Sequence, residues 1–409
     1  MTILLFAIEP GRSGPARLPQ NLMTAGLGVT IVCPTDNPLY HTASCDHRVA
    51  LPHTKSGWRM ARILDKAVRT TRTRMIIPAD EQALALLRAV LDGPYARGVG
   101  ERTRHVLTQS LAAPEALDKL IFKSHTMALA RTLGIAVPDG RTVETLEDAR
   151  AFAAAAGYPV FLKHSFSWAG AGVVKCADEA ELAAALAAMQ TGESRLKATL
   201  RRLLGRDWYP AQAPIDIQSP IAGRPAMYCA LAWKGRLIAG FAGTPLAVSS
   251  ETGPSTCVEV GAHVLMEAMS RKMIEATGAT GLIGFDFMLA KADGMPHMLE
   301  CNARPIQISH LGYRIGVDIA ADLRAVLGGK PLPSSPRSAT CSLDVCLFPY
   351  ALAADRVPRH LFCDIPGADP ALMAFGRAML AMIEARHKAE ATSLIGDTLA
   401  ATGIQPIAA

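Results

Sequence analysis

The sequence predicts an α/β protein whose second part is α+β, and three observations support this fold class. Strand-like and helix-like segments alternate from residue 1 to about 105, which predicts a parallel sheet with crossover helices. A short apolar strand at 158–164 leads into a glycine-containing loop, and an antiparallel hairpin follows at 282–302. Half of the chain is hydrophobic and 19% is charged, which is the composition of a chain that folds.

Length and charge limit the classes of function. With 409 residues the chain should form two to four domains, at roughly 100–200 residues per domain. The net charge of +6 is too small for a protein that coats nucleic acid, and the basic stretch 55–74 is expected to be a solvated helix face. No run of about 18 apolar residues occurs, so we expect neither a nucleic-acid nor a membrane partner.

The cysteines and the N-terminus indicate a cytoplasmic protein. Nine cysteines without a CxxC pair argue against a disulfide framework and against a zinc ribbon. The first residues have neither the basic start nor the small-residue cleavage site of a signal peptide.

The N-terminal segment has the pattern of a Rossmann-like domain. The expected strands are Ile3 to Ile8, Val29 to Cys33 and Met75 to Pro78, and the expected helices are 16–25, 57–68 and 80–91. The loop Gly11 to Gly14 lacks GxGxxG spacing, so this domain is expected to bind no dinucleotide of its own.

The middle of the chain contains a lysine at a position suited to phosphate. A single helical segment is expected over 111–133 and an alanine-rich helix over 146–156. The strand Tyr158 to His164 then carries Lys163 near its end, followed by a loop with Gly170 and Gly172. A lysine beside a loop whose glycines admit close backbone approach suits a phosphate, although many plain surface loops also carry glycines.

The hairpin brings oxygen-bearing side chains together. Its expected strands, Leu282 to Leu289 and His297 to Asn302, flank the turn signal Asp293-Gly294. Strand alternation places Asp286 opposite Glu300, with Asn302 on the same face as Glu300. Such oxygen ligands suit Mg²⁺, whereas a wet strand face is the plain alternative. Apolar neighbours of the cluster favour the metal site.

The rest of the chain is less informative. His310 is expected to be structural, and the basic insertion 193–208 is expected to be a solvated helix that steers anions at most. After a Pro/Ser-rich linker, a small tail contains a strand-like run, Cys341 to Phe348, and an amphipathic helix near 370–387.

Two stretches resemble one known family. Gly284-Phe285-Asp286 and the later run Leu299-Glu300-Cys301-Asn302-Ala303-Arg304-Pro305 are similar to the metal-binding end of the ATP-grasp superfamily. The pattern Gly157, Pro159, Lys163, Gly170, Gly172, Val173 resembles the lysine strand and glycine-rich flap of that family. The resemblance implies a two-lobed ATP-grasp fold after the Rossmann-like domain, with domains at 1–110, 111–222 and 223–330 and a C-terminal extension at 331–409.

The resemblance also implies a set of site residues. ATP would bind with two Mg²⁺ ions, or Mn²⁺ in their place, held by Asp286, Glu300 and Asn302. Lys123 and Lys163 would contact the phosphates, with Lys119 as a competitor of Lys123, and Arg304 and Lys163 would act in catalysis. The segment 215–223 resembles the adenine-binding hinge, which assigns base contacts to Gln218, Ser219 and Ile221. Ser219 stands where an acidic residue is usual, so the ribose contact stays open.

The implied activity is that of a carboxylate–amine ligase. ATP would activate a carboxylate as an acyl phosphate, with release of ADP and phosphate after an amine attacks. The expected partners are these small molecules, and a homodimer is compatible with them. One alternative is a carboxylase or carbamoyl-phosphate-synthase-like enzyme that uses bicarbonate, and another is a non-catalytic ATP-binding regulator. A flap that includes Phe166 and Trp168 would close over ATP.

Overall fold

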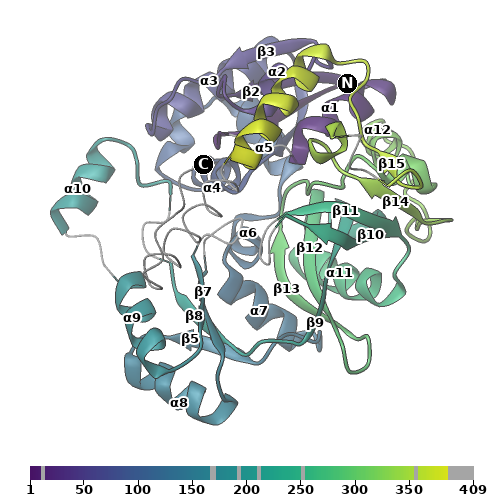
Figure 1. Ribbon diagram of the computed structural model, residues 1–409. Coiled ribbons are helices and arrows are strands. Elements are labelled where there is room, and N and C mark those ends of the chain that lie inside the picture. Colours follow the sequence, from purple (N-terminus) through teal and green to yellow (C-terminus); the bar gives the residue numbers. More distant parts are fainter. Residues whose placement is uncertain are drawn as a thin grey trace, which may run out of the picture.

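The computed structural model (Figure 1) describes residues 1–10, 14–165, 172–190, 195–209, 213–249, 254–353 and 358–385. Within them the strands form three sheets, one of four strands near the N-terminus, one of four strands in the middle and one of seven strands that reaches toward the C-terminus. The predicted α/β fold class is confirmed. No helix in this part of the chain is long and apolar enough to cross a bilayer.

The N-terminal sheet is parallel, as predicted, because each strand is followed by a covering helix. Its order is β3-β2-β1-β4. The strands are β1 (Thr2–Phe6), β2 (Gly28–Cys33), β3 (His47–Ala50) and β4 (Thr73–Pro78). The helices are α1 (Leu18–Thr24), α2 (Pro38–His41), α3 (Gly57–Thr70), α4 (Glu81–Leu91) and α5 (Glu101–Ser110). Strand β3 was not predicted, since three of its four residues are exposed and give no apolar signal.

The middle sheet is antiparallel and has its own small apolar core. Its order is β5-β8-β6-β7. The strands are β5 (Gly140–Val143), β6 (Val160–His164), β7 (Val173–Cys176) and β8 (Ile215–Gln218). The accompanying helices are α6 (Pro114–Ile121), α7 (Lys123–Thr132), α8 (Leu146–Ala156), α9 (Glu179–Met189) and α10 (Arg195–Leu203).

The prediction of a single helix over 111–133 is wrong. The chain breaks at Phe122, whose φ of −93° and ψ of 121° are extended rather than helical. Two helices result, and Lys123 becomes the first residue of α7. The backbone N–H of Lys123 donates to the carbonyl of Ser165 at 2.8 Å, so a contact with β6 fixes the start of α7.

The seven-stranded sheet contains the predicted hairpin. Its order is β13-β12-β9-β10-β11-β14-β15. The strands are β9 (Gly223–Trp233), β10 (Arg236–Val248), β11 (Ser255–Gly261), β12 (Gly281–Ala290), β13 (Pro296–Asn302), β14 (Leu343–Cys346) and β15 (Phe362–Cys363), with α11 (Val264–Thr277) and α12 (Ile319–Leu327). Phe285 and Phe287 of β12 are fully buried in one core, which turns Asp286 to the opposite face.

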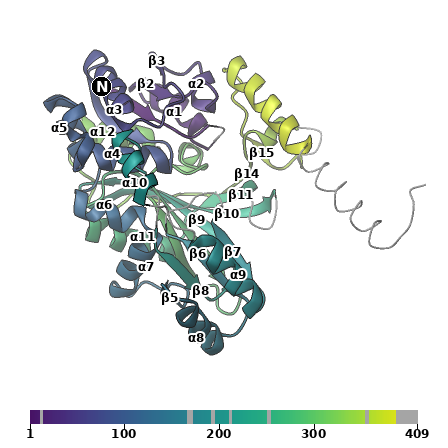
Figure 2. The ribbon, with the colours of Figure 1, turned by 90° about the vertical axis from the view of Figure 1, so that its left-hand side faces the viewer.

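The C-terminal segment packs on two other parts of the molecule. The predicted strand-like run forms β14, which pairs with β11 in the seven-stranded sheet. The predicted amphipathic helix is present over 370–385 and lies near α2 of the N-terminal sheet (Figure 2). There Asp369 accepts from Thr42 Oγ1 at 2.7 Å, and the rings of His41 and Phe375 stack at 4.5 Å.

Candidate functional site

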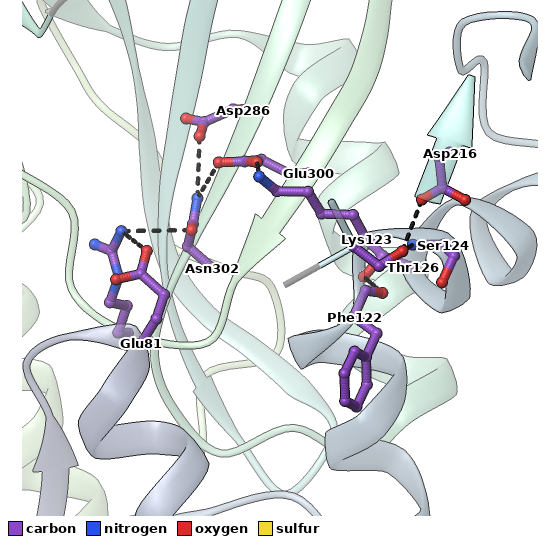
Figure 3. Close-up of polar contacts among 11 residues, drawn as sticks. Glu81, Phe122, Lys123, Ser124, Thr126, Asp216, Asp286, Glu300 and Asn302 are labelled. Atoms are coloured by element: carbon purple, nitrogen blue, oxygen red, sulfur yellow. Dashed lines mark hydrogen bonds and ion pairs between the residues drawn. The ribbon is translucent and has the colours of Figure 1, made fainter. Parts of the chain in front are cut away.

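The hairpin places three polar side chains at one end of β12 and β13. Asp286 and Glu300 are register partners across the two strands, as alternation predicted. Asn302 Nδ2 donates to Asp286 Oδ2 at 3.0 Å and approaches Glu300 Oε1 at 3.4 Å (Figure 3). The three residues therefore form one hydrogen-bonded cluster.

The two carboxylates of this cluster have opposite pKa shifts. Burial and the neighbouring Glu300 charge raise the pKa of Asp286 well above its usual range. Burial would raise the pKa of Glu300 too, but the Lys123 ammonium, the hydrogen bond with Asp286 and the Lys163 charge together outweigh burial and lower it to about 2. A divalent cation would favour the ionised form of Asp286, and the hard oxygen donors of the two carboxylates suit such an ion.

The described residues do not complete a metal site by themselves. They contain no group of three His, Cys, Asp or Glu side chains close enough to hold an ion. Mg²⁺ commonly takes one or two carboxylates from the protein and the rest of its shell from water and phosphate. Asp286 and Glu300 fit that pattern. Asn302 instead turns its amide nitrogen toward the two carboxylates, and its Oδ1 lies 3.5 Å from Arg304 Nη2, so the amide would have to rotate to offer its oxygen to a metal.

Two lysines of the middle sheet's domain reach the hairpin. Lys123 Nζ lies 2.9 Å from Glu300 Oε2, at the start of α7 (Figure 3). Burial lowers the pKa of Lys163 to about 8; the Glu300 carboxylate opposes this shift and the Lys123 ammonium adds to it. Lys119, the competitor, is exposed on α6. Lys123 thus pairs with Glu300, and Lys163 lies near enough for its charge to act on the same carboxylate.

Ser165 anchors both lysine-bearing elements and was not predicted. It is fully buried one residue after β6, and its Oγ accepts from the Ser124 N–H at 3.1 Å. The same Oγ donates to Asp216 Oδ2 at 2.7 Å, and Thr142 Oγ1 donates to the other oxygen of Asp216 at 2.7 Å. Asp216 was not predicted either. It could have been recognised from the sequence, because it stands between the two isoleucines of β8, which are buried.

Arg304 connects the hairpin to the N-terminal sheet. Its guanidinium forms an ion pair with Glu81, the first residue of α4, and its Nη1 donates to the carbonyl of Pro305 at 3.0 Å. Its Nε is buried without a hydrogen-bond partner among the described residues. The buried Asp80 fixes this end of α4, because its carboxylate accepts from the Ile8, Glu9 and Ala83 N–H groups at 2.7 to 2.9 Å. Glu81 was missed because it lies 223 residues from Arg304.

The predicted flap and hinge are only partly described. Gly170, Phe166 and Trp168 lie outside the described residues. Gly172 has a φ of +80°, which favours glycine, and its carbonyl accepts from the His164 N–H at 2.9 Å.

The hinge residues continue from β8 toward β9. Gln218 pairs with both β5 and β6, and the Ser219 N–H donates to the Asp139 carbonyl at 2.9 Å. Ile221 lies two residues before β9. A base at this hinge would have to compete with Asp139 for the Ser219 N–H.

Comparisons with known proteins identify the fold. The family model "Carbamoyl-phosphate synthase L chain, ATP binding domain" matches residues 121–200. Biotin carboxylase from Campylobacter jejuni superposes with a TM-score of 0.61 at 17% identity, over 84% of this chain and 75% of that one. The chain has the ATP-grasp fold.

Two further ATP-grasp structures are similar. Carboxyaminoimidazole ribonucleotide synthase from Aspergillus clavatus, complexed with ATP, gives a TM-score of 0.59 at 15% identity, over 84% of this chain and 81% of that one. The L-amino acid ligase from Bacillus licheniformis gives 0.55 at 16% identity, over 85% and 80%. At these identities the similarity establishes the ATP-grasp fold and leaves the substrate to be argued from the site.

Proposed function

We propose that this protein is an ATP-dependent ligase that activates a carboxylate as an acyl phosphate for attack by an amine. The observation that carries the proposal is the hydrogen-bonded cluster of Asp286, Glu300 and Asn302, in which Glu300 is paired with Lys123 and lies within the electrostatic reach of Lys163. A metal-binding carboxylate pair facing two ammonium groups suits the polyphosphate of a nucleotide. The ATP complex of the Aspergillus relative supports ATP as the nucleotide.

Each charged group has a role in this proposal. Asp286, Glu300 and Asn302 would hold Mg²⁺, as two ions or with Mn²⁺ in their place, and bound metal would neutralise the terminal phosphates. Lys123 would exchange its contact with Glu300 for a phosphate oxygen. Lys163 would contact the transferred group, and Arg304 would stabilise the charge that develops on it.

The proposed reaction has two steps. A carboxylate oxygen attacks the γ-phosphorus while the bond to the ADP oxygen breaks, which leaves an acyl phosphate and ADP. The amine nitrogen then forms a bond to the acyl carbon, inorganic phosphate departs with the former carboxylate oxygen, and the nitrogen loses a proton. This chemistry requires positioning and charge neutralisation rather than a covalent protein nucleophile.

The remaining parts of the chain would serve this reaction. We assign residues 1–110 to a pre-ATP-grasp domain, 111–222 and 223–330 to the two lobes, and 331–409 to a C-terminal extension. Gln218, Ser219 and Ile221 would contact the base, and Gly170 and Gly172 would belong to a flap over the phosphates. The free thiols of all nine cysteines support a reducing, cytoplasmic location.

The amine and the carboxylate are proposed to be amino acids or similar metabolites. The L-amino acid ligase among the relatives supports this class. A similar structure, the biotin carboxylase domain of 2-oxoglutarate carboxylase from Hydrogenobacter thermophilus in complex with MgADP and bicarbonate, supports the second candidate, in which bicarbonate is the activated acid.

A screen for ADP release separates these functions. Purified protein with Mg·ATP would be mixed with pairs of amino acids, with and without bicarbonate, and products would be detected by mass. Stimulation by an amino-acid pair, with a product lighter than the pair by one water, supports the ligase. Stimulation by bicarbonate alone supports the carboxylase, and tight ATP binding without turnover under any condition supports a regulator.

A further inference from the structure

The fold brings two basic segments together that lie far apart in the sequence. The chain after α10 packs on the start of α3, where the Gly57 N–H donates to the Gly205 carbonyl at 2.7 Å. Trp208 Nε1 also donates to the Lys55 carbonyl at 2.9 Å. These contacts fix the C-terminal end of α10 beside the N-terminal sheet, while the helix itself stands at the outer edge of the molecule (Figure 1).

Helix α10 exposes a row of leucines. Leu196, Leu200 and Leu203 follow the i, i+4, i+7 spacing of one helix face and are 79%, 52% and 79% exposed. Leu204, one residue past the helix, is 45% exposed. Four large apolar side chains in nine consecutive residues form a patch, whereas single exposed leucines would need no explanation.

Exposed positive charges lie in both of these adjoining segments. The exposed cations are Lys197, Arg202 and Arg206 in and after α10, and Lys55, Arg59, Arg62 and Lys66 in and before α3. A surface hollow of about 540 Å³ on α3 is lined by Ser56, Trp58, Arg59, Arg62, Ile63 and Lys66. It combines cations with apolar surface in the same way as α10.

The acidic side chains within these segments are already bonded. Asp65 accepts from the Gly100 N–H and from Thr103 Oγ1, and Asp207 accepts from the Tyr95 hydroxyl. The seven exposed cations also outnumber these two carboxylates, so the basic face, which we define as those cations together with the exposed leucines of 196–204, is positive and apolar at once.

We propose that the basic face binds an anionic lipid surface, with α10 lying in the plane of the headgroups. A short helix with leucines on one side and Lys or Arg beside them matches this mode of binding, in which apolar side chains enter the boundary and cations contact phosphates. A second copy of the chain is a poor partner, because its own positive face would be placed against this one. Nucleic acid would use the cations but gives no role to aliphatic leucines.

This binding is compatible with the described helices, none of which spans a bilayer. The expectation of no membrane partner rested on the lack of a long apolar run, and that criterion tests only for spanning segments. Binding in the plane requires one apolar face, which α10 has. The inference is independent of the proposed ligase chemistry.

Vesicle flotation of the full chain tests the proposal. Vesicles of phosphatidylcholine alone would be compared with vesicles containing phosphatidylglycerol, at low and high salt. We expect flotation only with the anionic vesicles and a loss of at least about tenfold in bound protein at high salt, because exposed charges are screened. Two variants separate the apolar contribution to binding from the electrostatic one. The first, Leu196→Gln/Leu203→Gln, removes leucines and keeps the charges. The second, Arg59→Gln/Arg62→Gln/Lys66→Gln, removes charges and keeps the leucines. Each should lose at least about tenfold in bound protein.

Matched controls and contrary outcomes complete the test. Leu265→Gln and Lys330→Gln alter an exposed leucine and an exposed lysine elsewhere, and should float like the wild type. Unchanged melting temperature in all variants excludes misfolding as the cause. Absence of flotation, equal flotation with neutral vesicles, or wild-type flotation of the leucine variant would each overturn the proposal. Retention on poly-glutamate without vesicle binding would assign the face to an acidic polypeptide and would also overturn it.

Discussion

Lys163 is the residue whose protonation should report directly on nucleotide binding. Burial lowers its pKa to about 8, so the free protein loses this ammonium as the pH rises through about 8. A bound phosphate would raise the pKa again, because an opposite charge favours the charged form. We therefore predict proton uptake on binding of an ATP analogue at pH 8.5, and almost none at pH 6.5.

Calorimetry in buffers of different ionisation enthalpy measures this uptake. In Lys163→Ala it should vanish and the affinity should fall, whereas Lys175→Ala, an exposed lysine on the neighbouring strand β7, should resemble the wild type. Equal uptake in Lys163→Ala and wild type would place the phosphate site elsewhere.

Glu300 should be the side chain whose loss affects turnover most. It is the partner of both Asp286 and Lys123, and its removal would eliminate a metal carboxylate and leave Lys123 without its ion pair. We predict that Glu300→Ala lowers ADP release at least about 1000-fold, since metal stabilisation of transition-state charge amounts to several kcal/mol. Steady-state kinetics measure this, with Glu259→Ala, an exposed glutamate of the same sheet, as the control. A folded Glu300→Ala protein with near wild-type turnover would contradict the assignment.

At the scale of elements, the contact of β6 with α7 positions the two lysines. Ser165 Oγ accepts from the Ser124 N–H and donates to Asp216 inside a fully buried site. Ser165→Ala would leave these groups without their partner, and we predict a loss of about 1 to 3 kcal/mol in the free energy of unfolding.

Urea unfolding with a buried control tests this prediction. Ser270 of α11 is also fully buried, but its hydroxyl has no hydrogen-bond partner among the described residues. Ser270→Ala should therefore cost much less than Ser165→Ala. Equal costs for the two substitutions would show that the Ser165 hydrogen bonds do not stabilise the junction.

The elements that could be predicted are those whose signal is local. Alternating residues and the Asp293-Gly294 turn predicted the hairpin and the pairing of Asp286 with Glu300. The break at Phe122 was missed because a contact with Ser165, 43 residues away, imposes it on a stretch with a helical pattern. Strand β3 was missed because it is an exposed edge strand.

At the scale of the whole molecule, Asp364 joins three distant parts of the chain. Its carboxylate accepts from Arg17 Nε at 3.0 Å and lies 2.9 Å from His310 Nε2, with all three side chains nearly buried. This contact is compatible with the structural role expected of His310. Burial would raise the pKa of Asp364, but His310 and Arg17 outweigh it and hold the pKa far below its usual value.

Removing the Asp364 carboxylate should lower the free energy of unfolding, because this side chain joins three parts of the chain. A depressed pKa means that the contribution to stability is present above the unfolded pKa of about 4 and is lost as the pH falls below it. At pH 7 we predict that Asp364→Asn costs about 3 kcal/mol, since it leaves the buried Arg17 guanidinium without its opposite charge and changes the hydrogen-bond partner of His310. Urea unfolding measures the difference, with the exposed Asp139→Asn as control; equal stability of the two variants would refute it.

Contacts between residues that lie far apart in the sequence also explain which residues the sequence could not predict. Asp286, Glu300, Asn302 and Arg304 lie in one continuous stretch, where spacing and family resemblance point to them. Glu81 and Asp364 contact the same region from opposite ends of the chain, and nothing in their local sequence pairs them with Arg304 or His310.

The central claim, that a carboxylate is activated by phosphoryl transfer from ATP, can be tested with oxygen isotopes. A pool of amino acids labelled with ¹⁸O in the carboxyl group would be incubated with the protein, Mg·ATP and unlabelled water, and the released phosphate analysed by mass spectrometry. An acyl-phosphate route predicts one ¹⁸O atom in each phosphate released, because the former carboxylate oxygen leaves with phosphorus. Turnover of the labelled pool that releases only unlabelled phosphate, or that yields labelled AMP instead, would contradict the account.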